Sequence, residues 1–380
     1  MPQDPSFYLS NRPKVQWILG QAAIFFIALS VWHVCALAQG VRPETVASGL
    51  QNPWAVAFLP DGRMLVTERP GRIRYINQDG SLSEPLTGLP AIEVAGQGGL
   101  LDVLLHPDFS QNQQIFISYN EPAAGGSSTA VARATLRDNA LTDVTVIFSA
   151  APKFQSRHHF GGRLVVTDDR HLFITLGDRG QRRQDAQTFD NHHGKVVRLN
   201  LDGSVPADNP YVKDDKVLDD IWSYGHRNIQ GAVLHPVTKE LWTNEHGPQG
   251  GDEINITRAT LNYGWPTITY GEEYGGGKIG QTAKDGMEQP LHYWVPSIAP
   301  SGMTFYLDDA IPGWQNNLLV GSLKFGQLVR LELDGEKVSH EERIMIGQRI
   351  RDVRQGPDGA VYLLTDQADG QLLRLRAASN

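Results

Sequence analysis

The chain has 380 residues and a formal net charge of −8 at pH 7, from 42 acidic and 34 basic side chains. This excess of acids argues against nucleic acid as a partner. Cys35 is the single cysteine, so the chain has no pair for an internal disulfide, and its stability must come from burial of apolar side chains and from any metal that it binds.

Residues 1–38 have the pattern of a secretion signal. Arg12 and Lys14 form a short basic region, Ile18 to Ala38 is mostly apolar, and the last three residues fit the small-x-small cleavage rule. The alternative is an uncleaved anchor, because the apolar run is close to the ~20 residues that a membrane span needs. The polar chain that follows favours cleavage after Ala38. We therefore expect a periplasmic or secreted bacterial protein, without stable membrane association after cleavage, and one domain over residues 39–380.

The rest of the chain consists mainly of short β-rich runs that are broken by Gly, Pro, Asp and Asn. Six pairs of such runs are each joined by a turn and predict hairpins. The pairs are 55–58 with 64–67, 103–105 with 115–118, 164–166 with 171–174, 232–234 with 240–243, 303–306 with 317–321, and 353–355 with 360–363. No long helical periodicity appears after residue 40.

A recurring hairpin with variable insertions is typical of a β-propeller. The sequence therefore predicts an all-β fold, a six-bladed β-propeller of four-stranded antiparallel blades. A long β-sandwich would not explain a recurring unit, and a β-helix needs a shorter period. The run Glu44–Leu50 precedes the first hairpin and could pair with the last blade, which would close the ring and remove its open edges.

Several polar motifs lie between these strands. Gly96–Gly99 is too rich in glycine for an ordinary strand, so its backbone either turns sharply or approaches a ligand. Arg349 and Arg351 lie on the same face of a strand, where two guanidinium groups repel each other unless an anion lies between them. The alternative for this pair is a solvated position on an outer edge.

The motif Gly225–Asn228 is followed, about twenty residues later, by the acidic and turn-rich loop Glu245–Asn255. Hard oxygens from Asp252 and Glu253, together with backbone carbonyls, suit a divalent cation that holds an anionic organic ligand. The alternative is a tight hairpin loop with solvated acids.

Four histidines, His158, His159, His192 and His193, raise the question of a zinc site. Adjacent histidines point to opposite faces of a strand, and the chain has neither an HExxH pattern nor a cysteine outside the signal segment. These features argue against zinc.

An ordered set of motifs resembles the soluble quinoprotein sugar dehydrogenases, in particular the aldose sugar dehydrogenase branch. The motifs are Gly96–Leu101, His159–Leu164, Gly225–Asn228, Glu245–Pro248 with Gly251–Asn255, Asn262–Pro266 and Arg349–Val353. The resemblance extends from about residue 43 to residue 376. It implies an enzyme that uses pyrroloquinoline quinone (PQQ) and Ca²⁺ on a six-bladed propeller and oxidises aldose sugars at the anomeric carbon to lactones, with a soluble electron acceptor of unknown identity.

The resemblance also implies roles for individual residues. His159 matches the general base, and Arg351 matches a residue that stabilises charge on the quinone. The positions that match the family's PQQ-holding residues are Gln97, Arg227, Asn228, Tyr274, Lys324, Arg349 and Arg351. The carbonyls of Gly247 and Pro248 match ligands of the calcium ion beside the cofactor, and Glu253 and the carbonyl of Tyr263 match a further calcium site.

Two other functions remain open on the sequence. A calcium-dependent propeller hydrolase of the sugar lactonase type would use acids around one metal and an activated water. A non-catalytic binding propeller would present its surface to a protein or glycan. Neither explains the ordered motif set.

Overall fold

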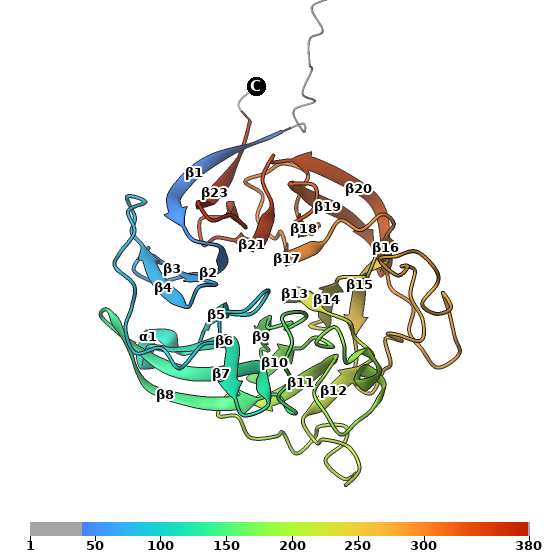
Figure 1. Ribbon diagram of the computed structural model, residues 1–380. Coiled ribbons are helices and arrows are strands. Elements are labelled where there is room, and N and C mark those ends of the chain that lie inside the picture. The colour runs from blue at the N-terminus through green and yellow to red at the C-terminus, as the bar shows by residue number, and fades with distance from the viewer. Residues whose placement is uncertain (1–39, 379–380) are drawn as a thin grey trace, which may run out of the picture. The chain divides into compact units, whose positions relative to one another are not determined.

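The computed structural model describes residues 40–378, so the predicted signal segment lies outside the described residues. In the described part, nearly all regular structure is β-strand; the exceptions are the four-residue helix α1 (Phe109–Asn112) and the 3₁₀ helix η1 (Arg183–Gln187). The strands form six antiparallel sheets that surround a common centre (Figure 1). The predicted six-bladed β-propeller is confirmed. None of the helices among residues 40–378 is long and apolar enough to cross a membrane.

Each sheet is one blade with an inner strand nearest the centre in Figure 1. In five blades this strand comes first along the chain, whereas in the closing blade the first strand along the chain, β1 (Val41–Leu50), lies outermost. All six predicted hairpins are found as the two innermost strands of a blade. Blade one consists of β2 (Pro53–Phe58), β3 (Met64–Glu68) and β4 (Arg72–Ile76), and blade two of β5 (Leu100–Leu105), β6 (Gln114–Ala123), β7 (Gly126–Arg137) and β8 (Ala140–Ser149). Blade three consists of β9 (Leu164–Val166), β10 (His171–Thr175), β11 (Lys195–Asn200) and β12 (Ile221–Tyr224), and blade four of β13 (Ile229–Leu234), β14 (Leu241–Glu245), β15 (Asp252–Thr257) and β16 (His292–Trp294). Blade five consists of β17 (Pro300–Phe305), β18 (Leu318–Ser322), β19 (Gln327–Asp334) and β20 (Lys337–Met345), and blade six of β21 (Ile350–Gln355), β22 (Val361–Thr365), β23 (Gly370–Ala377) and β1 (Val41–Leu50).

Blade one differs from the other five because it has three strands instead of four. After β4 the chain makes a single antiparallel bridge, from Leu82 back to Ile76, and then runs on without a ladder. Pro85 and Pro90 lie in this stretch, and proline cannot donate a ladder hydrogen bond. The outer edge of this blade is therefore irregular.

The ring closes through its two ends. Strand β1 pairs antiparallel with β23, from Val41 opposite Ala377 to Leu50 opposite Gly370, as the sequence predicted for Glu44–Leu50. Figure 1 shows the first strand of the chain beside the last. The closing blade thus combines residues that are more than 300 positions apart, and every blade of the ring has a neighbouring blade on both sides.

The apolar core consists of six buried clusters, each shared by two neighbouring blades. Blades six and one, for example, pack Leu50 and Leu364 against Val56 and Val66, all at most 2% exposed. Packing on both faces explains why strands such as β2 and β14 are buried along nearly their whole length instead of alternating between buried and exposed residues. Their ends are held by tight packing, which makes the centre of the ring a rigid place for a site.

Candidate functional site

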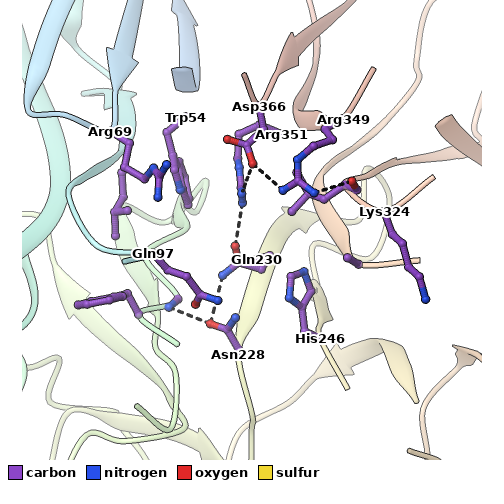
Figure 2. A pocket seen from close by; sticks show the side chains of 15 residues that line it. Trp54, Arg69, Gln97, Asn228, Gln230, His246, Lys324, Arg349, Arg351 and Asp366 are labelled. Carbon is purple, nitrogen blue, oxygen red and sulfur yellow. Dashed lines mark hydrogen bonds and ion pairs between the residues drawn. The ribbon is translucent and has the colours of Figure 1, made fainter. Parts of the chain in front are cut away.

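A cavity of about 500 Å³ lies at the centre of the ring, where the inner strands of the blades begin. All six blades contribute to it, and Figure 2 shows its polar side chains converging from different strands. The lining residues are Trp54, Arg69, Gln97, Leu101, Phe160, Gly161, Asn228, Gln230, His246, Ala299, Leu323, Lys324, Arg349, Arg351 and Asp366. Five of the seven predicted cofactor-holding residues are among them: Gln97, Asn228, Lys324, Arg349 and Arg351.

The cavity is strongly cationic. Arg69, Lys324, Arg349 and Arg351 bring four positive charges, and Asp366 is the only acid in the lining. Burial lowers the pKa of His246 to about 3, so its ring is neutral and adds no charge. The lining therefore has a net charge of about +3 at neutral pH. Such a cavity suits a ligand that carries several carboxylates.

Asp366 explains how the two arginines share one face. The same carboxylate oxygen, Oδ2, lies 2.8 Å from Nη2 of Arg349 and 3.1 Å from Nη2 of Arg351. Burial alone would raise the pKa of Asp366, but the two guanidinium groups hold it well below its usual range, so the carboxylate stays ionised. Arg351 also donates from Nη1 to Gln230 Oε1 at 3.0 Å, and its buried Nε finds no acceptor among residues 40–378.

His159, the predicted base, lies at the edge of this cavity, directly before the lining residue Phe160. Its backbone N–H donates to Gln97 Oε1 at 2.8 Å. Its Nδ1 lies 2.5 Å from Asp178 Oδ1. Since an ionised carboxylate only accepts, the proton of the neutral ring resides on Nδ1 and leaves Nε2 as a free acceptor. The backbone of His159 has a φ of +54°, in the left-handed region, so its peptide geometry is set by the surrounding loop rather than by a strand.

Burial lowers the pKa of His159, and the positive charge of Arg227 lowers it further, while the hydrogen bond to Asp178 acts in the opposite direction. The imidazole is therefore neutral at physiological pH. Asp178 is fully buried and also accepts from Trp265 Nε1 at 2.7 Å and from the backbone N–H of Gly180 at 2.6 Å. The arrangement holds the ring in one tautomer with its free nitrogen available for a proton.

Arg227 is absent from the cavity lining. It is 5% exposed, and its Nη1 donates to the carbonyls of His246 at 2.9 Å and Gly247 at 2.8 Å. The guanidinium group lies over the ring of Trp265, 5.3 Å from the centroid, and its Nε has no partner in the part of the chain that the structure describes. Arg227 thus links the predicted base, whose pKa it influences, to the loop of the predicted metal ligands.

Tyr274 does not join the other predicted residues in this structure. It is 73% exposed, lies in the long connection between β15 and β16, and is absent from the cavity lining. Four glycines follow Tyr274 within six residues, so its sequence context is that of a surface loop.

The loop of Gly247 and Pro248 is shaped by Asp252. The carboxylate of Asp252 accepts from the backbone N–H of Gly247, Ile298 and Ala299, at 2.8 to 2.9 Å, and from Ser297 Oγ at 2.7 Å. These four donors occupy the carboxylate oxygens of Asp252, which the sequence analysis expected to bind a cation. A Cβ on Gly247 would come within 2.1 Å of the carbonyl oxygen of Gly250, so only glycine fits there.

Glu253 and Tyr263, the predicted second calcium site, lie away from the cavity. Asn255 Nδ2 donates to Glu253 at 3.1 Å and to Glu245 at 3.3 Å. Burial and the neighbouring Glu245 raise the pKa of Glu253. The buried Glu245 and the half-buried Glu253 are paired across two strands, and a cation would be stabilised between such carboxylates. Among residues 40–378, however, no group of three or more His, Cys, Asp or Glu side chains has metal-binding geometry, so a cation would depend on backbone oxygens as well.

Several residues of the site carry no pattern that sequence reasoning could use. Asp178 and Asp366 each follow a strand end, β10 and β22, where polar residues often face a site, and this is the only local signal for them. Trp54, Arg69 and Gln230 are single residues in or beside ordinary strands. Their position becomes visible only once the ring is closed.

Comparisons with known proteins give the family. The family profile described as glucose/sorbosone dehydrogenase matches residues 50–374. The Escherichia coli (strain K12) protein named aldose sugar dehydrogenase YliI is 46% identical over 344 residues, which cover 88% of this chain and 92% of the relative.

Two solved structures extend this likeness to three dimensions. The apo-form of soluble aldose sugar dehydrogenase from Escherichia coli has a TM-score of 0.86 at 46% identity and covers 89% of this chain and 100% of its own. The PQQ-bound form of an aldose sugar dehydrogenase from Streptomyces coelicolor has a TM-score of 0.74 at 26% identity, with coverage of 90% and 99%. The chain therefore belongs to the glucose/sorbosone dehydrogenase family, the soluble quinoprotein sugar dehydrogenases, and is an oxidoreductase of that family.

Proposed function

We propose that this chain oxidises aldose sugars at the anomeric carbon to lactones, with PQQ and Ca²⁺ as cofactors and His159 as the general base. The observation that carries the proposal is the cavity itself, in which four cationic side chains and one acid surround a space next to a neutral, carboxylate-held histidine. PQQ carries three carboxylates, and the net charge of about +3 in the lining balances them.

Gln97, Asn228, Lys324, Arg349 and Arg351 would hold the cofactor, because they line the cavity and offer amide and cationic donors. Arg227, which lies outside the lining, would contribute a further donor through its unpartnered Nε. When bound, PQQ supplies a two-electron acceptor for the hydride that leaves the anomeric carbon. The unpartnered Nε–H of Arg351 is a donor for negative charge that develops in the cavity during this transfer. Tyr274 stays a prediction from the resemblance alone.

His159 Nε2 would accept the proton of the anomeric hydroxyl. Asp178 would fix the ring through Nδ1 and stabilise the imidazolium as it forms. A positioned general base of this kind contributes about 10²–10⁴ in rate.

Calcium is the second proposed cofactor. The carbonyls of Gly247 and Pro248 would be ligands beside the cavity, because Gly247 follows the lining residue His246 directly. Glu253 and the carbonyl of Tyr263 would form a further site next to Glu245. Calcium prefers oxygen ligands, and a backbone-rich set agrees with the absence of a side-chain cluster in residues 40–378. A lactonase would need acids around one metal, and this same observation gives that alternative no support.

We also propose that residues 1–38 direct export, which would place the enzyme in the periplasm or outside the cell, where a soluble acceptor takes up the electrons.

Reconstitution tests the function. Protein treated with a chelator should reduce a dye acceptor in the presence of an aldose only after PQQ and Ca²⁺ are both added, and with neither alone. A parallel tube with a sugar lactone and a pH indicator should stay unchanged. Acid release in that tube without dye reduction would identify a lactonase instead, and recovery with PQQ in metal-free buffer would contradict the role of calcium.

A further inference from the structure

Trp54, in the inner strand β2, forms a wall of the cavity that the predicted site residues leave unassigned. It is 3% exposed and lines the cavity. The indole N–H groups of Trp222, Trp265 and Trp294 each donate to a protein oxygen. The Nε1 of Trp54 has no such partner among residues 40–378, and neither has the buried Nε1 of Trp242, which lies outside the cavity lining. Because Trp54 lines the cavity, a ligand there can supply the acceptor that the protein does not.

The indole of Trp54 is held in place by a stacked guanidinium group. The guanidinium carbon of Arg163 lies 4.3 Å from the centroid of its ring. Arg163 is itself 1% exposed and forms ion pairs with Asp102 at 3.3 Å and Asp352 at 3.0 Å. Its Nε donates to the carbonyl of Gln230 at 3.2 Å. A guanidinium group anchored on three sides cannot follow a moving ring, and it therefore fixes the plane of the indole.

The two walls of the cavity differ in chemistry. Figure 2 shows Trp54 and Arg69 on one side and Lys324, Arg349 and Arg351 across the space. Arg69 is oriented by a hydrogen bond from Nη1 to the carbonyl of Gly96. A flat, rigid donor on one wall, opposite a group of cations on the other, fits a planar ligand with anionic oxygens on more than one edge.

We propose that Trp54 is a further cofactor-holding residue, which donates its Nε1–H to an oxygen of the planar anionic cofactor. Arg163 is the positioning residue that holds the indole for this contact. The inference rests on the proposed function, because it takes PQQ as the ligand. It concerns affinity and orientation of the cofactor and leaves the proton transfer at His159 unchanged.

Equilibrium binding of PQQ to PQQ-free protein, in buffer with Ca²⁺, tests the contact without any turnover. Trp54→Phe keeps an aromatic ring but lacks the donor, and its Kd for PQQ should rise about tenfold, as expected for loss of one hydrogen bond to a charged group. Trp54→His restores a ring N–H, and its Kd should stay within about threefold of the wild type. Trp222→Phe is the matched control, since Trp222 lies outside the cavity lining, and its Kd should not change.

The outcomes separate this inference from the proposed function. If the wild type does not bind PQQ, both are overturned. If the wild type binds and Trp54→Phe binds equally well, or if the Phe and His variants lose affinity equally, the hydrogen bond from Trp54 is overturned and the proposed function stands. Trp54→Met, which fills the space without a donor, replaces the Phe variant if that protein does not fold.

The role of Arg163 has its own readout. In ¹⁵N-labelled protein, the indole N–H signal of Trp54 is assigned as the signal that disappears from the spectrum of Trp54→Phe. It should move downfield when PQQ is added to the wild type. In Arg163→Lys, which keeps the charge but loses the planar stack, this signal should broaden and its shift should shrink. An unchanged shift in Arg163→Lys, with folding intact, would overturn the positioning role.

Discussion

At the scale of single residues, the site depends on carboxylates that act through another side chain. Asp178 holds His159 in one tautomer, and Asp366 allows Arg349 and Arg351 to share one face of the cavity. The sequence predicted the residues that meet the ligand better than the residues that hold them. The reason is physical: histidines and arginines between glycines form a local motif, whereas a single aspartate at a strand end looks like any turn residue.

The pair His159 and Asp178 predicts a particular pH dependence. Because burial lowers the pKa of His159, the neutral base persists below pH 6.5, and kcat of the PQQ-loaded enzyme should fall only as the pH drops through that lowered pKa. Asp178→Asn removes the group that raises this pKa, so the acid limb should move to lower pH and kcat at neutral pH should fall about 10²-fold. The measurement is kcat against pH for the wild type and the variant.

Two further variants complete this test. His159→Ala should bind PQQ normally and lose most turnover. His158→Ala is the control, because the neighbouring ring is exposed and lies 6.2 Å from that of His159. Wild-type kcat in His159→Ala with PQQ bound would remove the base assignment.

Asp366 predicts a stability effect that depends on the ligand. In Asp366→Asn the two guanidinium groups lose their shared counter-charge, and the free energy of unfolding without ligand should fall by about 2 kcal/mol. Saturating PQQ should reduce this loss, since its carboxylates replace the missing charge. Urea unfolding with and without PQQ measures both values. Asp369→Asn, an exposed acid of the same connection, should change neither, and an equal loss for Asp366→Asn with and without PQQ would contradict the account.

At the scale of elements, the sequence predicted all six hairpins, because each has a turn signal between two β-rich runs. It also predicted the pairing of Glu44–Leu50 with the last blade. It did not predict that blade one lacks a regular fourth strand. The stability of an outer strand depends on the strands beside it, so local sequence carries little information about where a ladder stops.

The closing strand makes a measurable contribution to stability. Leu50 is fully buried in the cluster between blades six and one, and Leu50→Ala should lower the free energy of unfolding by about 3 kcal/mol through lost burial and a cavity. Ser48→Ala on the same strand is exposed and should change it by less than about 0.5 kcal/mol. Denaturant unfolding of the two variants checks the prediction, and similar values for both would mean that β1 does not close the ring in solution.

At the scale of the whole molecule, ring closure is what creates the site. Residues from Trp54 to Asp366 meet in one cavity, and all six blades supply part of it. The propeller fold could be predicted from the repeated hairpins, because this repetition is visible in a single sequence. The residues that meet at the centre could be predicted only in part, from the family's motifs. Nothing in the local sequence marks Trp54, Arg69 or Gln230 as neighbours of Arg351.

The most direct test of the central claim is a single turnover without an electron acceptor. Protein loaded with PQQ and Ca²⁺ under anaerobic conditions is mixed with an excess of aldose, and the absorbance of the quinone and the amount of lactone are followed together. The account predicts one equivalent of lactone for each quinone that changes its spectrum, with both events slowed by His159→Ala at least about 10²-fold. An unchanged quinone spectrum across a panel of aldoses, in protein shown to hold PQQ, would contradict it.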